Sequence, residues 1–171
     1  MMNKFVLIIS VSTLFCSCLS ATHAPLSPPE VVSRVELSRY TGTWYEIARY
    51  PNRFQKGCTD TSAAYKLGSD GSLAVLNSCL KKGTLTTAKG KARVIDPITN
   101  AKLKVSFFWP FSGDYWIIDL GEDYDYAVVS TPNRKYLWIL ARSPEMDNFL
   151  YMQIVGRLKQ KGFDIKLLER S

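Results

Sequence analysis

Histidine is nearly absent from this 171-residue chain: the only one is His23, close to the N-terminus. A folded region that begins after residue 35 therefore contains none. This excludes Ser-His-Asp and Cys-His nucleophilic mechanisms, histidine-ligated haem and most zinc catalysis. Cysteine is also scarce, because only Cys58 and Cys79 follow Cys16 and Cys18. We therefore expect neither a metal site nor a cofactor.

The chain also lacks any dense run of basic residues, although its net charge is +7. Lysines and arginines are scattered, with pairs such as Lys81-Lys82, as is typical of a solvated surface. A positive balance favours nucleic acid or an anionic membrane as a partner. Because the N-terminus predicts export, where nucleic acid is rarely met, we expect no nucleic-acid partner.

The apolar run from Phe5 to Phe15 is too short to span a bilayer, and Lys4 precedes it, as in a signal peptide. The following Ser17-Cys18 resembles the cleavage site of bacterial lipoproteins, in which the cysteine is lipid-modified and becomes the N-terminus. Cleavage near Ala21, which would give a soluble periplasmic or secreted protein, is the alternative.

The next segment is rich in proline, with Pro25, Pro28 and Pro29 among serines and threonines. Such a composition favours an extended tether. We therefore divide the chain into a signal peptide (1–17), a tether that starts at Cys18 (18–35) and one domain (36–171).

Alternation of period two dominates the domain, with neither strand–helix alternation nor solenoid repeats. Turn signals such as Gly68-Ser69-Asp70-Gly71 and Thr131-Pro132-Asn133 separate short strands. The class is all-β, an antiparallel barrel or sandwich. The predicted strands are 42–50, 59–67, 72–79, 83–96, 101–108, 114–120, 125–131 and 135–142.

One helix is predicted after the last of these strands, with Ser143 as N-cap and Pro144 at its first position. Its apolar residues recur at helical spacing, and Gly162 ends it. A short strand, 163–168, should follow. The helix must pack on the outside of the barrel, since strand residues line the interior.

Trp44 lies near the start of the strand series and Arg142 near its end. When the sheet closes, the guanidinium can lie over the indole face in a cation–π contact. This pair would seal and stabilise one end and leave the other open to a ligand.

Strand alternation then assigns the inward side chains. Small residues among them face large aromatics, which favours a ligand cavity over the alternative, a fully packed core. We predict that the ligand is bound by Ala63, Tyr65, Val75, Asn77, Ala92, Val94, Leu103, Val105, Phe107, Tyr115, Ile117, Tyr136 and Trp138.

Four aromatic residues lie within 107–111, at the predicted open end. They form either a gate packed over the cavity or an exposed patch for membrane contact, ligand entry or a homodimer. Both interpretations stay open.

Cys58 and Cys79 bracket the predicted hairpin 59–79, so they should lie nearly opposite one another. A disulfide there is geometrically plausible and compatible with export. A metal pair or a reactive thiol is the weaker interpretation, since further ligands are missing.

Three motifs in order, Gly42-Thr43-Trp44-Tyr45, Asp125-Tyr126-Ala127 and Arg142, resemble the signature blocks of the lipocalins. The stretches 44–49, 104–108 and 136–140 resemble bacterial outer-membrane lipocalins and their apolipoprotein D-like relatives. The resemblance implies an eight-stranded antiparallel up-and-down barrel with one C-terminal flanking α-helix. It also implies an apolar ligand: a fatty acid such as palmitate, a phospholipid or a lysophospholipid.

We therefore expect a binding, storage or transport protein, lipid-anchored through Cys18 at the periplasmic face of the outer membrane. One alternative is a lipid-modifying enzyme using carboxylates, for which Glu46 and Asp119 are the only acids near inward positions. Another is a protein-interaction module with a filled barrel.

Overall fold

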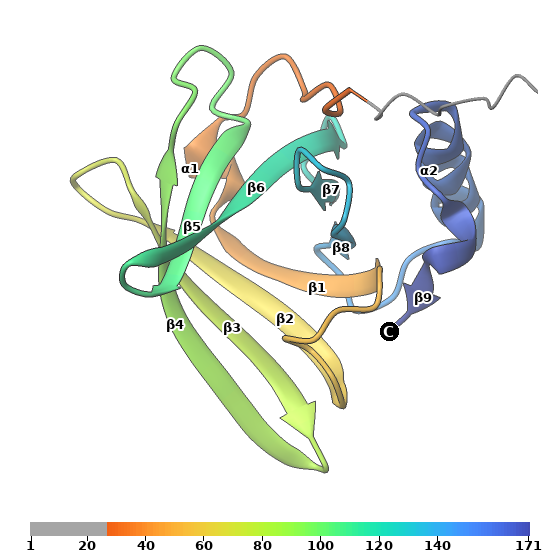
Figure 1. Ribbon diagram of the computed structural model, residues 1–171, viewed down its shortest axis with the longest axis horizontal. Helices are drawn as coiled ribbons and strands as arrows, with labels where there is room; N and C mark the ends of the chain where they lie inside the picture. Colours follow the sequence, from red (N-terminus) through yellow and green to blue (C-terminus); the bar gives the residue numbers. More distant parts are fainter. Residues whose placement is uncertain (1–26) are drawn as a thin grey trace, which may run out of the picture.

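In residues 27–171, the part of the chain that this computed structural model describes, eight antiparallel strands close into a barrel (Figure 1). Each strand pairs with the next, and β1 pairs with both β2 and β8, which closes the sheet. The predicted up-and-down barrel is confirmed. Its strands are β1 (Gly42–Arg49), β2 (Cys58–Leu67), β3 (Leu73–Lys81), β4 (Thr84–Val94), β5 (Lys102–Phe108), β6 (Phe111–Leu120), β7 (Tyr126–Ser130) and β8 (Leu137–Ala141).

Alternation along the strands divides the apolar residues between two cores. In β7, Ala127 and Val129 belong to the barrel interior, whereas Val128 belongs to a second core outside the barrel. That outer core also contains Ile154 and Leu158 of helix α2 (Asn148–Gln160). The helix thus packs on the outside of the barrel, as predicted, and it covers the outer face of β7 and β8. No helix among the described residues is long and apolar enough to cross a membrane.

The predicted start of this helix is wrong. Asp147, and not Ser143, is the N-cap, since its carboxylate accepts hydrogen bonds from the backbone N–H groups of Phe149 (2.9 Å) and Leu150 (3.1 Å). A carboxylate at this position satisfies two donors that the helix leaves free. Pro144 therefore lies in the loop before the helix.

The strand predicted at 163–168 is also wrong. This stretch forms a 3-10 turn, η1 (Ile165–Leu167), because the Asp164 carboxylate accepts a hydrogen bond from the Lys166 N–H (3.1 Å). A two-residue strand, β9 (Glu169–Arg170), follows and pairs with the far half of β1.

The predicted tether is too long, since its last nine residues, 27–35, pack on the barrel. The Val32 N–H donates to the carbonyl of Ile117 (3.0 Å), and the Val35 N–H donates to that of Thr99 (2.7 Å). Val35 is completely buried in the interior core. The folded domain therefore begins before residue 36, while Cys18 and the rest of the predicted tether lie outside the described residues.

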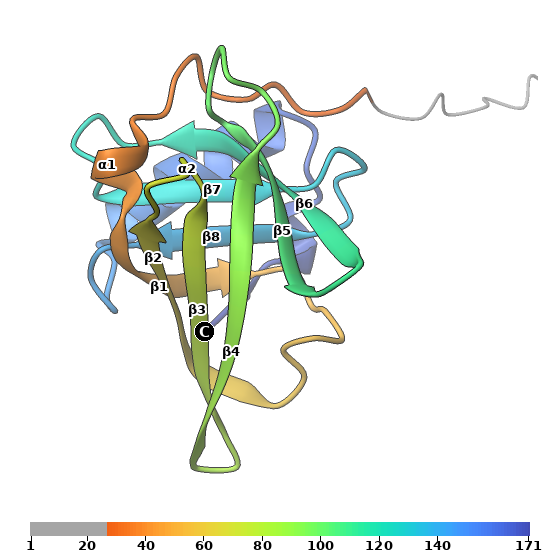
Figure 2. The ribbon, with the colours of Figure 1, turned by 90° about the vertical axis from the view of Figure 1, so that its left-hand side faces the viewer.

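The two ends of the barrel differ in what covers them. Residues 32–36 and the short helix α1 (Leu37–Tyr40) cross the end at which β1 begins, and we call this the closed end. Ser27 lies further away, where its carbonyl accepts a hydrogen bond from Arg134 of the β7–β8 loop (3.1 Å). The opposite, open end carries the loops β1–β2, β3–β4, β5–β6 and β7–β8. There the β3–β4 hairpin projects beyond its neighbours (Figure 2), and residues 81–89 are exposed on both faces.

Candidate ligand-binding site

The inner wall of the barrel carries most of the side chains that alternation predicts there. Five are buried in the interior core: Tyr65, Val75, Ala92, Leu103 and Ile117. Six more pack against that core but stay partly exposed: Ala63, Val94, Val105, Phe107, Tyr115 and Trp138. Because these side chains lie on the inner face, their exposed surface borders the space inside the barrel.

Asn77 and Tyr136 complete the predicted set. Asn77 pairs with Ala63 of β2 and continues the inward face of Val75, and its Oδ1 is buried without a hydrogen-bond partner. Tyr136 precedes β8 and stacks on Trp138, with ring centroids 5.9 Å apart and planes at 18°. Ligand binding by all thirteen residues stays a prediction.

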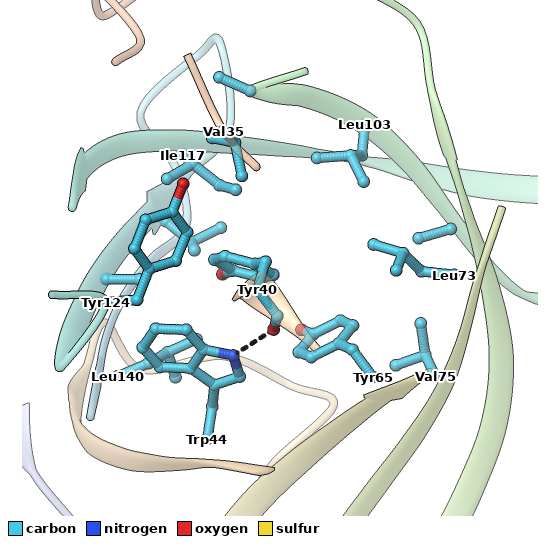
Figure 3. Close-up of a cluster of buried hydrophobic side chains, with 14 residues drawn as sticks. Val35, Tyr40, Trp44, Tyr65, Leu73, Val75, Leu103, Ile117, Tyr124 and Leu140 are labelled. Carbon is cyan, nitrogen blue, oxygen red and sulfur yellow. Dashed lines mark hydrogen bonds between the residues drawn. The ribbon is translucent and has the colours of Figure 1, made fainter. Parts of the chain in front are cut away.

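At the closed end, Trp44 is completely buried, and its Nε1 donates a hydrogen bond to the carbonyl of Tyr40 (2.8 Å; Figure 3). The guanidinium carbon of Arg142 lies 3.8 Å from the centre of the indole ring. The same guanidinium donates to the carbonyls of Thr43 (3.0 Å), Arg39 (2.6 Å) and Tyr124 (3.2 Å). The expected contact is therefore present, and hydrogen bonds to three backbone segments accompany it.

Gly42 makes room for this arrangement. Its φ is +93°, a region that side chains disfavour, and a Cβ there would lie 3.2 Å from Arg142 Nη1. The contact with Arg142 and the positive φ thus explain why the Gly-x-Trp motif has a glycine at this position.

Above the Trp44 indole, three tyrosine hydroxyls form a chain across the floor of the barrel. The Tyr65 hydroxyl donates to that of Tyr115 (2.9 Å), which is 2.8 Å from that of Tyr40. Burial raises the pKa of Tyr65 to about 12 and raises the pKa of Tyr40 and of Tyr115. All three are therefore neutral at physiological pH. Tyr40 was missed by strand alternation because it lies in α1, before the first strand.

The buried carboxylate of Glu46 has a structural explanation. It accepts hydrogen bonds from Arg49, from Gln55 and from the Ser171 hydroxyl (2.8 Å), and Gln55 accepts one from Trp138 Nε1 (2.8 Å). Its charge is thus matched by Arg49. The network lies where β2 leaves β1 after the Tyr45–Ser62 pair, and it joins the β1–β2 loop to the barrel wall.

Asp119, the other acid near an inward position, pairs instead with Arg157 of α2 (2.7 Å). Glu46 and Asp119 therefore serve separate networks and form no acid–base pair. Within residues 27–171, no group of three or more His, Cys, Asp or Glu side chains is placed to hold a metal ion.

Cys58 and Cys79 form the predicted disulfide, with Cα atoms 5.5 Å apart. It links β2 to β3 towards the open end. The register of the two strands shifts there, between Thr59 and Ser62.

The rim of the open end exposes aromatic side chains. Trp109 is 92% exposed, and Phe108 and Phe111 are similarly open to solvent, so the gate interpretation is wrong for these three. Phe107 instead lies against the inner face of Gly90, where an added Cβ would lie 2.8 Å from its ring. Next to the rim, the β1–β2 loop borders a pocket of about 470 Å³, lined by Arg49, Pro51, Asn52, Arg53, Gln55, Lys56, Gly57 and Glu169.

Residues 35–171 match the family model of the lipocalin-like domain. The chain is 40% identical over 154 residues to the outer membrane lipoprotein Blc of Escherichia coli, which covers 89% of this chain and 86% of that one. It is also 40% identical over 151 residues to temperature-induced lipocalin-1 of Arabidopsis thaliana (83% and 81%). Apolipoprotein D of Macaca fascicularis is 35% identical over 151 residues (82% and 77%).

Solved structures agree on the fold. Insecticyanin from the tobacco hornworm Manduca sexta superposes with a TM-score of 0.70 at 22% identity, covering 86% of this chain and 87% of that one. At this identity the likeness concerns the fold alone.

Proposed function

We propose, given that the chain belongs to the lipocalin family, that its barrel binds, stores or transports a fatty acid, a phospholipid or a lysophospholipid. One observation carries this proposal: apolar side chains on the inner wall, among them Val105, Phe107 and Trp138, stay partly exposed inside a barrel with one open end. Covering this apolar surface with an apolar ligand chain removes it from water, which is favourable.

The energetics favour a long acyl chain. Each buried methylene contributes about 0.8 kcal/mol before the costs of ordering the ligand. Trp138 lies on this wall towards the open end, since it pairs with Arg49, the last residue of β1, and with Val129 on β7. Its ring also stacks on Tyr136, which leads towards the rim.

The test is the variant Trp138→Asp, titrated with a fluorescent long-chain fatty acid. We expect binding at least tenfold weaker, because a carboxylate on the inner wall would lose its hydration beside the chain. Phe149→Asp is the matched control, since Phe149 is exposed on helix α2 away from the interior. Equal affinity of a folded Trp138→Asp variant and the wild type would overturn the assignment of this wall.

We assign binding rather than catalysis, because the two acids near inward positions belong to separate networks. A bound lipid should therefore leave the protein unchanged. Mass spectrometry of lipid co-purified with the protein, repeated after prolonged incubation, checks this. Conversion of the lipid to a new product would favour the lipid-modifying enzyme instead.

The place of action that we propose is the bacterial outer membrane, on its periplasmic side. Relatives of similar length are outer membrane lipoproteins by name, and the chain carries Ser17-Cys18 after an apolar run. Acylation of Cys18 would supply the anchor. The aromatic rim at 108–111 would then contact the lipid surface.

The anchor is tested by fractionation. We expect wild-type protein in the membrane fraction and Cys18→Ser in the soluble periplasm. Soluble wild-type protein with a mature N-terminus at Thr22 or later would contradict the anchor and leave ligand binding intact.

A further inference from the structure

In the chain of tyrosine hydroxyls on the barrel floor, one hydroxyl proton has no acceptor. Three hydroxyls supply three protons, but only two hydrogen bonds join them, Tyr65 to Tyr115 and Tyr40 to Tyr115. The structure gives these hydroxyls no other partner among the described residues. Buried hydroxyl protons normally find an acceptor, so one donor here is left for something else.

The position of that proton follows from the two directions in which the Tyr40–Tyr115 bond can run. If Tyr115 donated to Tyr40, the spare proton would be on Tyr40, which is only 1% exposed. If Tyr40 donates, Tyr115 accepts two hydrogen bonds and keeps its own proton. Tyr115 is partly exposed towards the interior. The second arrangement avoids an unsatisfied buried donor, whose cost is substantial.

A positive charge lies just below this floor. The Arg142 guanidinium bonds only to backbone carbonyls, and the ion pairs within residues 27–171 do not include it. It lies over Trp44, whose ring is 4.9 Å from that of Tyr40. The guanidinium is partly exposed to solvent on the far side of this aromatic layer, so its charge is screened and we assign it to the closed end and not to the ligand.

We infer that the floor binds the polar head of the ligand, with the Tyr115 hydroxyl donating a hydrogen bond to a carboxylate or carbonyl oxygen. A single-chain fatty acid therefore enters head first, and its methyl end lies towards the open end. This inference rests on the proposed function and makes it more specific. A lysophospholipid has no free carboxyl group at the end of its chain and offers only an ester carbonyl, so this hydrogen bond favours a fatty acid.

A second polar group on the inner wall agrees with a polar end inside the barrel. Asn77 Oδ1 is buried and has no partner, although Asn77 belongs to an otherwise apolar face with Val75 and Leu73. A pure hydrocarbon interior would leave this acceptor unpaired, at a cost. A water that accompanies the head group would donate to it.

The first measurement compares Tyr115→Phe with wild type in titrations with palmitate and with lysophosphatidylcholine. Loss of a hydrogen bond to a carboxylate should weaken palmitate binding about tenfold or more, while lysophosphatidylcholine changes little. Tyr45→Phe is the matched control, because Tyr45 lies on β1 next to Trp44 and faces outward. Equal palmitate affinity in Tyr115→Phe and wild type would overturn the inference.

The second measurement needs no variant. Palmitate labelled with ¹³C at C2 or at C16 is bound to the wild-type protein, and nuclear Overhauser effects from each label are recorded. We expect C2 protons close to the rings of Tyr65 and Tyr115, and C16 protons close to Phe107. The reverse assignment overturns the head-first orientation and leaves the proposed function standing. Failure of both lipids to bind wild-type protein overturns the proposed function as well.

Discussion

The closed and open ends of this barrel are built from the same alternating strands but treat aromatic residues in opposite ways. At the closed end, Tyr40 and Trp44 are buried and hydrogen-bonded. At the open end, Phe108, Trp109 and Phe111 are largely exposed. Burial of a large aromatic contributes strongly to folding. The closed end thus supplies stability, whereas the open end keeps apolar surface available for a partner.

The difference comes from segments outside the eight strands. Residues 32–40 cross the closed end and bring Val35 and Tyr40 into the interior core. At the open end, the β3–β4 and β5–β6 connections are tight turns, and the longer β1–β2 loop contacts the wall at Tyr136 and Trp138. A variant at the closed end should therefore change the free energy of unfolding, and one at the open end should change binding.

The largest expected effect is that of Trp44→Ala. Removing a completely buried indole leaves a cavity and frees the carbonyl of Tyr40, so the free energy of unfolding should fall by about 3–5 kcal/mol. Denaturant titration followed by circular dichroism measures this. Trp109→Ala is the control and should change the same quantity by less than about 0.5 kcal/mol. Similar losses in both variants would show that the two ends do not differ in stability.

The next largest effect is that of removing the disulfide, which links β2 to β3 towards the open end. Replacing Cys58 and Cys79 together by serine removes a cross-link between residues 21 apart. The chain-entropy model gives a loss of about 3 kcal/mol. Thermal unfolding of the double variant, compared with that of the wild type in oxidising buffer, measures it. An unchanged melting temperature would mean that the backbone hydrogen bonds between β2 and β3 hold these strands together without help from the disulfide.

Alkaline pH should destabilise the closed end. The pKa of Tyr65 is raised to about 12 in the folded protein, above its ordinary value of 10.0. Below pH 10 both states keep the proton, and between pH 10 and 12 only the unfolded state releases it, so stability falls as pH rises. A shift of two units corresponds to a loss of roughly 3 kcal/mol at most. Melting temperature against pH tests this, and Tyr65→Phe should flatten the decline.

Arg142→Ala should lower the free energy of unfolding by about 1–3 kcal/mol. The variant loses the contact over Trp44 and leaves the carbonyls of Thr43, Arg39 and Tyr124 without their donor. Fatty-acid affinity should change less than stability, because the guanidinium lies below the floor. A variant with wild-type melting and no binding would reverse this assignment.

Strand alternation predicted the barrel well because a closed sheet with one buried inner face forces residues of one parity inward. This holds for Leu103, Val105 and Phe107 on β5, and it would hold in any barrel with this register. The pairing of Cys58 with Cys79 followed from the same hairpin geometry.

The errors lie where local capping or distant packing competes with the pattern. Ser143-Pro144 predicted a helix start at 143, but the helix begins after Asp147, because the Asp147 carboxylate accepts hydrogen bonds from two backbone N–H groups. Segment 27–35 has the composition of a linker, yet Val32 and Val35 find backbone partners on loops and strands far along the chain. Such partners become visible only once the barrel is closed. For the same reason, the sequence predicted Tyr65 and Tyr115 as wall residues but not the hydroxyl chain that joins them to Tyr40.

Trp109→Ser should have the smallest effect on stability, but it should clearly weaken membrane binding. Trp109 is 92% exposed, so its removal should leave the melting temperature unchanged. An indole that enters the lipid interface contributes to membrane affinity, and basic Lys81 and Lys82 lie on another loop of the same rim. Binding to vesicles containing anionic lipid should therefore weaken several-fold, as measured by co-sedimentation in the Cys18→Ser background. Phe149→Ser is the matched control, because Phe149 is an exposed aromatic on helix α2. Equal loss of vesicle binding in both variants would mean that the open end has no preferred contact with the membrane.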